Sequence, residues 1–550
     1  MVDYSPNIPI ILSKMPKKGQ TCTFVLKPCT MLDCPPITQK VQCNYDSEVF
    51  CHMALNAHQA NTSANMFNTE RMKAMDFKVM LIGTSQLSFP GDKAGRFHKA
   101  AEELKVFLAD LGASLVVYPE NVITAEDAKR SLTMVHAESP DFLLVQNTSY
   151  SAGFLAMVYG KAGYPLGQWA IPEGGVDGIV QFNSFCSINM HMSIIKNYYP
   201  HDRIPVKWFF GEVNDEMFAK RMCTTIKALR TIKRMKQSKI ALIGGIAPGF
   251  NDLYFDERDM LKRFEGMEFN RLHEFDEIGD RAMSYSDDEI AKMAEKFEAK
   301  AKLGVQPYSV RHKMMNARFL KAYNDFLAEY HYDAIAISCW PKFMDKFDYS
   351  ICSVVATLND QLVPAACEGD VPSAVSMLML QEITGKSAMC MDMSAFDEKD
   401  ESVLMWHCGP AAAEFCCDAG YSLGGNYSGK AHIPNEPPIC CGVARDMVFK
   451  AQPVTIGCMT GNFDQLLVCA GEFLDEKKPS FIGSRGWMGN LTIAGEKCSA
   501  RDMVATVLDQ SLPHHFALGV GNQTDVLMEI AAWMDLDVIQ KSTYTDYMKY

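Results

Sequence analysis

FKVMLIGTS (77–85) is a short apolar run that is followed by GRFHKAAEELKVFLADLG (95–112) and then by SLVVYPE (114–120). The first and third segments have the continuous apolar character of buried strands. The middle segment places its apolar residues at helical spacing and ends at Gly112, a residue type that often follows the last turn of a helix. A strand, a helix and a second strand in this order predict a βαβ unit with parallel strands.

The same alternation continues to about residue 370. Further strand-like runs are DFLLVQNTS (141–149), SKIALIGGIAPGF (238–250), YDAIAISCW (332–340) and QLVPAACEGD (361–370). Segments with helical periodicity lie between these runs, over 213–236, 287–303 and 313–330. We therefore expect two Rossmann-like α/β domains of similar size, each with a parallel sheet.

The pattern changes after about residue 388, where short alternating runs separated by turn residues replace the helical periodicity. These runs are QPVTIGCMTG (452–461), DQLLVCAGEFL (464–474), PSFIGSRGW (479–487) and NLTIAGEKC (490–498). Short strands at close spacing favour a mostly antiparallel, barrel-like sheet. The sequence thus predicts an α/β protein in which two α/β domains precede a C-terminal β-rich domain.

The expected domains cover 1–204, 205–387 and 388–550. The first 75 residues show little periodicity, so we expect them to form an irregular arm that packs on its own subunit or on a neighbour. The first domain, with this arm, would serve an oligomer interface and substrate recognition. A chain of 550 residues is too long for one hydrophobic core, which agrees with several domains.

Composition excludes several classes of protein. The formal net charge of −13 supplies no basic surface for a nucleic acid. No run approaches 18 uninterrupted apolar residues, and the N-terminus has no secretory signal pattern, so we expect no membrane span. The 19 cysteines form no CxxC pair, and their number is odd. Reduced thiols in a cytoplasmic protein are therefore the expectation.

Polar residues that could carry chemistry stand where apolar runs end or begin. Glu368 follows VPAAC, Asp392 follows SAMCM, and His514–His515 opens the run HHFALGVG. Ligands of α/β proteins collect at the carboxyl ends of parallel strands. Two carboxylates and an imidazole suit Mn²⁺, Mg²⁺ or Co²⁺ better than tetrahedral Zn²⁺. The alternative is that the carboxylates cap helices or lie in solvated loops, and that the histidine pair is structural.

Several stretches resemble the L-fucose isomerase and L-arabinose isomerase superfamily. They are KALRTIKRMKQSKIALIGGIAPGF (227–250), CEGDVPSAVSMLMLQEITGKSAMCMDMSAFD (367–397), QPVTIGCMTGNFDQLLVCAGEFL with SRGW (452–474 and 484–487), and PHHFALGVGNQTDVLMEIAAWMDLDVI (513–539). The resemblance covers roughly residues 205–540, while residues 1–204 match weakly.

This resemblance implies a metal-dependent aldose–ketose isomerase that works through a metal-chelated enediol. Glu368, Asp392 and His515 would be the ligands of Mn²⁺, with Mg²⁺ or Co²⁺ as alternatives. Glu368 and Asp392 would also be the catalytic acid–base pair, because a proton must move between C1 and C2 of the sugar. His514 would contact the substrate or orient the site. His407 would contact the sugar, with a partly buried structural histidine as the alternative. The resemblance also implies a homo-oligomer, hexameric or based on trimers.

The substrate remains open at this stage. A deoxyhexose or pentose such as L-fucose or D- or L-arabinose is what the resemblance implies, and an anionic sugar such as sulfoquinovose is the alternative, because the N-terminal domain diverges. Arg485 could bind the substrate, including an anionic substituent, or form a structural ion pair. A nucleotide-dependent oxidoreductase is a rival hypothesis, although no GxGxxG occurs. A non-catalytic sugar-binding paralogue is another, although it would not need an intact metal-ligand set.

Overall fold

The computed structural model of the chain describes residues 22–25, 38–41, 76–198, 204–306, 308–428, 439–475 and 478–548. The chain divides into two compact units, Met1–Met66 and Phe67–Tyr550. In the first unit, β1 (Cys22–Val25) pairs with β2 (Thr38–Val41) in an antiparallel register. The sequence predicted no regular structure here, because strands of four residues are too short to show a period. The rest of the predicted N-terminal arm lies outside the described residues.

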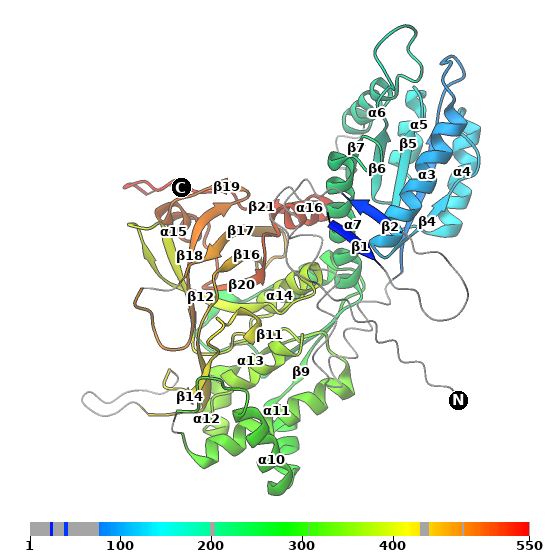
Figure 1. Cartoon of the computed structure of the whole chain (residues 1–550). Helices are drawn as coiled ribbons and strands as arrows, with labels where there is room; N and C mark the ends of the chain where they lie inside the picture. The colour runs from blue at the N-terminus through cyan, green and yellow to red at the C-terminus, as the bar shows by residue number, and fades with distance from the viewer. Residues whose placement is uncertain are drawn as a thin grey trace. The chain divides into compact units, whose positions relative to one another are not determined.

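The second unit begins with a five-stranded parallel sheet in the order β4-β3-β5-β6-β7 (Figure 1). Its strands are β3 (Phe77–Thr84), β4 (Ala113–Val117), β5 (Phe142–Asn147), β6 (Leu166–Ala170) and β7 (Val206–Phe210). They are joined through α3 (Lys93–Asp110), α4 (Ala125–Glu138), α5 (Gly153–Gly160) and α6 (Ser184–Tyr198). The apolar strands are covered on both faces, which is why their sequence runs are continuous rather than alternating.

A four-stranded parallel sheet follows, in the order β11-β10-β8-β9. Its strands are β8 (Lys239–Ile243), β9 (Glu268–His273), β10 (Ala334–Ile337) and β11 (Ala365–Ala366). The helical segments around it are α7 (Glu216–Lys236), η1 (Asn251–Leu253), α8 (Glu257–Arg263), α9 (Phe275–Ser284), α10 (Asp287–Glu298), α11 (Val310–Tyr330), η2 (Cys339–Phe343), α12 (Met344–Phe347), α13 (Cys352–Asp360) and α14 (Val371–Thr384). Because β8, β10 and β11 are parallel neighbours, the loops after them meet at one edge of the sheet.

The C-terminal part is β-rich. Its elements are β12 (Met389–Asp397), β13 (Ser402–His407), η3 (Ala413–Phe415), β14 (Ser422–Gly425), β15 (Val443–Val448), β16 (Gln452–Met459), β17 (Gln465–Phe473), β18 (Ser484–Ile493), β19 (Glu496–Lys497), α15 (Ala500–Asp509), β20 (His515–Val520), α16 (Thr524–Met534) and β21 (Asp537–Val538). The path β18-β13-β12-β20-β16-β17 closes into a barrel because β17 also pairs with β18.

One strand prediction in this part is wrong. The runs at 479–487 and 490–498 are not separated by a turn, since β18 continues from the first run into the second. Gly489 and Asn490 have the composition of a turn, and Asn490 has a positive φ of 53°. The register of β17 against β18 shifts between Ala470 and Glu472. Such a β-bulge absorbs an irregular backbone without ending the strand.

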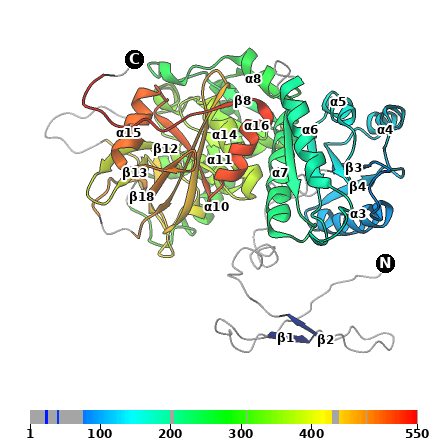
Figure 2. The same ribbon diagram turned by 90° about the horizontal axis from the view of Figure 1, so that it is seen from above.

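The helix α14 connects the second sheet to the barrel. It packs against β10 of the sheet and against β16 and β20 of the barrel. Figure 2 shows α14 near β8 of the same sheet and β12 of the barrel. Nearly all of its residues are buried, as a helix enclosed on all sides requires. The helix α14 therefore links the loop that carries Glu368 to β12, the strand that carries Asp392.

The fold class predicted from the sequence is confirmed: two parallel α/β sheets precede a β-rich barrel. The last strand of the first sheet, β7, lies beyond residue 204, so this sheet extends past the boundary expected there. The domain boundaries themselves stay predictions. The cysteines with a described placement are all free, in agreement with the expected reduced thiols. None of the helices in the described part of the chain has both the length and the apolar character of a membrane span.

Candidate active site

Glu368 lies at the carboxyl edge of the second sheet, directly after β11. Its φ is +62°, a left-handed conformation that costs a non-glycine residue about 1–2 kcal/mol. Hydrogen bonds to two neighbouring loops hold Glu368 in this backbone conformation. The Glu368 amide donates to Cys339 Sγ at 3.4 Å, and its carbonyl accepts from the Ala247 amide at 2.9 Å. Strain of this kind marks positions where the direction of a side chain matters.

Gly369, the next residue in the chain, allows its loop to lie against the backbone of Gly245 and Ile246. A side chain at this position is expected to lower the stability of the fold. Its φ is +75°, and a Cβ would lie 2.3 Å from the Gly245 carbonyl oxygen and 2.8 Å from Ile246 Cα. We expect Gly369→Ala to destabilise the fold by several kcal/mol, on the order of 3, because the positive φ and a backbone clash add. Gly163→Ala is the matched control, since Gly163 has a φ of +81° but nothing within 4 Å, and should cost about 1 kcal/mol. Equal thermal unfolding midpoints for the two variants would contradict this account.

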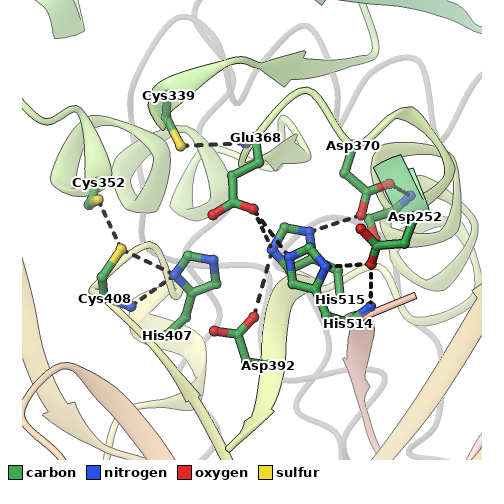
Figure 3. Close-up of polar contacts among 11 residues, drawn as sticks. Asp252, Cys339, Cys352, Glu368, Asp370, Asp392, His407, Cys408, His514 and His515 are labelled. Atoms are coloured by element: carbon green, nitrogen blue, oxygen red, sulfur yellow. Dashed lines mark hydrogen bonds and ion pairs between the residues drawn. The ribbon is translucent and has the colours of Figure 1, made fainter. Parts of the chain in front are cut away.

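Asp392 and His515 lie on adjacent strands of the barrel and face Glu368. They are direct partners in the register of β12 and β20. His515 Nε2 lies 3.6 Å from Glu368 Oε2 and 3.7 Å from Asp392 Oδ1. Figure 3 shows the three side chains converging from the edge of the second sheet and from the barrel. The structure thus brings together the three residues that the resemblance implied as metal ligands.

These residues fit a divalent cation. Asp392 Oδ1 and His515 Nε2 are buried and have no hydrogen-bond partner in the part of the chain that the structure describes. An unpaired buried polar atom costs about 1–3 kcal/mol, so two of them side by side require a shared partner. Ligand atoms of Glu368 and His515, and of Asp392 and His515, lie within 4.8 Å of one another. Carboxylate oxygens with one imidazole are a donor set that suits Mn²⁺, Mg²⁺ or Co²⁺.

The other ring nitrogen of His515 is held by a residue that the sequence interpretation missed. His515 Nδ1 lies 3.0 Å from Asp370 Oδ2, and Asp370 also accepts from the Ser373 amide at the start of α14. With its proton on Nδ1, His515 presents the lone pair of Nε2 toward Glu368 and Asp392. An Asp directly before a Val-Pro helix start was the available signal for this N-cap.

The electrostatics of the cluster favour positive charge at its centre. Burial opposes the charged form of His515, but neighbouring Cys390 and Asp370 raise its pKa well above the usual value. Burial likewise opposes the charge of Glu368, yet the hydrogen bond from His514 and the nearby imidazoles hold the pKa of Glu368 below its usual value. A proton or a metal cation supplies the positive charge that these carboxylates require.

His514 bridges Glu368 to a second missed residue, Asp252. Its Nδ1 lies 2.6 Å from Asp252 Oδ2, and its Nε2 lies 3.2 Å from Glu368 Oε2. The ring also packs against Phe250, with centroids 5.2 Å apart and the ring planes tilted by 32°. Burial would lower the pKa of His514, but its bonds to Glu368 and Asp252 raise it. His514 therefore orients Glu368, and nothing in the sequence joins it to Asp252, 262 positions away.

His407 and Arg485 differ in their relation to this cluster. His407 ends β13, is buried, and lies 5.5 Å from His515 between ring centroids. Burial lowers the pKa of His407. Arg485 pairs with Asp446 and donates to Ser480 Oγ and to the Gly483 carbonyl. The contacts described for its guanidinium do not join Arg485 to the cluster.

The curated proteins that are similar to this chain are all named sulfoquinovose isomerase. The chain is 26% identical over 429 residues to a sulfoquinovose isomerase of Priestia aryabhattai, which covers 77% of this chain and 91% of the relative. It is 24% identical over 433 residues to the enzyme of that name from Clostridium sp. (strain MSTE9), covering 78% and 92%. The match to the one from Alkalicoccus urumqiensis is 24% over 468 residues, covering 84% and 99%. The chain is an aldose–ketose isomerase.

The prediction that the chain is a sugar-isomerising enzyme is thereby confirmed, and the rival oxidoreductase hypothesis loses its support. No protein-family model matches the chain. Among solved structures, a solute-binding protein from Agrobacterium vitis bound with alpha-D-tagatopyranose is 15% identical, covers 56% of this chain and 90% of its own, and superposes with a TM-score of 0.15. A score this low does not establish a shared fold.

Proposed function

We propose that this isomerase converts an anionic sugar of the sulfoquinovose kind into its ketose, at the cluster of Glu368, Asp392 and His515. The observation that supports the site is the convergence of two carboxylates and one imidazole, in which the buried Asp392 Oδ1 and His515 Nε2 have no hydrogen-bond partner among the described residues. The relatives named for sulfoquinovose support the anionic substrate over L-fucose or arabinose. We also propose that the chain is fucose isomerase-like, as its motifs imply.

The chemistry requires a proton to leave C2 of the aldose and another to reach C1, through an enediol. A divalent cation held by Glu368, Asp392 and His515 would act as a Lewis acid for the two sugar oxygens. Glu368 and Asp392 both lie close to Nε2 of His515, so one carboxylate would take the proton while the other donates one. His514 keeps Glu368 ionised and directed toward this point. Asp370 holds the tautomer of His515.

Three further expectations stay predictions: manganese as the resident cation, a homo-oligomer based on trimers or hexamers, and a cytoplasmic location. The non-catalytic paralogue has no observation in its favour, because the candidate ligands are intact and in place.

The proposed function is tested with the full chain, a chelator and a small panel of sugars. We expect EDTA-treated protein to be inactive and Mn²⁺ to restore activity, because the orphaned ligand atoms need a cation. Sulfoquinovose should be turned over with a kcat/KM about 100-fold above that of glucose, which carries a hydroxyl in place of the sulfonate. Ketose formation is followed by NMR. Preference for L-fucose would restore the neutral-sugar hypothesis, and no ketose from any sugar would refute the function.

A further inference from the structure

We propose that His407 is a neutral imidazole that donates its Nε2–H to a sugar oxygen, and that it is not a fourth ligand of the cation. The role as a donor to substrate rests on the proposed function. The position of the proton on the His407 ring does not rest on the proposed function, because it follows from contacts between residues of the protein.

The first of these contacts concerns Nδ1 of His407. It accepts a hydrogen bond from the Cys408 backbone amide at 2.8 Å, and Cys408 Sγ lies 3.2 Å from the same nitrogen. An amide N–H can only donate, so Nδ1 must present a lone pair. In a neutral imidazole the single proton is then on Nε2.

A row of thiols behind the ring supports the same assignment. Cys352 Sγ lies 3.1 Å from Asn426 Nδ2, a group that can only donate, and 3.2 Å from Cys408 Sγ. Cys352 Sγ also lies 3.2 Å from Ser350 Oγ. A Cys352 thiol that donates to Cys408 and a Cys408 thiol that donates to His407 Nδ1 use the contacts drawn in Figure 3 and agree with an unprotonated Nδ1. In this arrangement Cys352 and Cys408 are positioning residues.

The second contact concerns Nε2, which is buried and lacks a partner among the described residues. A ring nitrogen of His407 and ligand atoms of Asp392 and His515 lie within 4.8 Å of one another. As a metal ligand, Nε2 would need its lone pair, and the proton would have to move to Nδ1, where the Cys408 amide already points. As a donor, Nε2–H needs only an acceptor between these groups, and a sugar oxygen bound there is such an acceptor.

This arrangement suits the reaction. Negative charge develops on the carbonyl oxygen as the enediol forms, and a fixed donor stabilises it without reorganisation. A neutral imidazole performs this role when its protonation is fixed by its surroundings. His407 would then be a catalytic residue that acts on oxygen, while the carboxylates act on the carbon-bound protons.

The tautomer is tested directly by NMR on full-length protein labelled with ¹⁵N-histidine, with His407→Gln used to assign the His407 signals. We expect a protonated Nε2 and an unprotonated Nδ1, both unchanged when diamagnetic Mg²⁺ is added. A protonated Nδ1, or loss of the Nε2 proton on adding Mg²⁺, would overturn the proposal. This measurement needs no substrate, so it is independent of whether the enzyme acts on a sulfosugar.

Variants supply the second test. His407→Ala should lower kcat about 100-fold, as loss of one oxyanion donor does. His407→Gln keeps an N–H near the Nε2 position and should recover at least tenfold of that loss. In both variants Mn²⁺ affinity by calorimetry should stay within threefold of the parent enzyme. A loss of Mn²⁺ affinity as large as that of a ligand variant such as Asp392→Asn would make His407 a ligand, against the proposal.

Discussion

Replacing Glu368 by Gln is expected to lower kcat for sugar isomerisation by about a thousandfold, the effect of losing a positioned acid–base group. The substitution keeps the shape of the side chain but removes its charge. It removes a candidate ligand oxygen and the partner of His514 Nε2. Mn²⁺ affinity should fall as well, because the site then offers one carboxylate fewer. Activity is measured as ketose formation and affinity by calorimetry.

The matched control is Glu398→Gln. Glu398 is exposed and pairs with Arg501 on the surface, so this variant makes the same chemical change without touching the cluster. It should retain the kcat and Mn²⁺ affinity of the parent enzyme. Full activity of Glu368→Gln, with its metal still bound, would remove Glu368 from the site.

The two adjacent histidines are expected to respond very differently to the same substitution. His515→Asn should weaken Mn²⁺ binding by about 100-fold or more and abolish turnover, because the buried Nε2 is a direct ligand in the proposed site. His514→Asn should keep the Mn²⁺ affinity within about tenfold of that of the parent enzyme. It should lower kcat by about tenfold, because His514 only orients Glu368. Calorimetry with Mn²⁺ and kinetics at saturating metal separate the two effects.

If His514→Asn lost the metal and His515→Asn kept it, the assignment of the pair would be reversed. Near-ultraviolet circular dichroism of both variants checks that the barrel is intact, since His515 begins β20 and has no exposed side-chain surface.

Most of the fold was predictable because its elements have strong local signals. The run at 77–85 and the helix that follows it appear as β3 and α3, and α3 begins after its N-cap Asp92, whose side chain accepts from the Gly95 amide. Apolar periodicity reports which face is buried, and burial is what stabilises these elements. The prediction failed where this signal is absent: in the four-residue strands β1 and β2, and where β18 continues through Gly489.

The residues of the candidate site likewise divide into those that had a signal in the sequence and those that had none. Glu368, Asp392 and His515 stand at the ends of apolar runs, and the resemblance assigned them a shared task. Asp370 had a readable signal as an N-cap, but not as the partner of His515. Asp252 had none.

The sequence by itself determined the order of strands and helices, the change from parallel to antiparallel sheets, and the residue types at the ends of the strands. These are local properties, set by periodicity and turn chemistry. Only the tertiary structure decided that Asp252 and Asp370 border the cluster, because their histidine partners lie on the far side of α14 in the chain and meet them only when the second sheet docks on the barrel. It also placed Cys352 beside Cys408, the residue after His407, because contacts between distant residues depend on which groups lie next to each other in space.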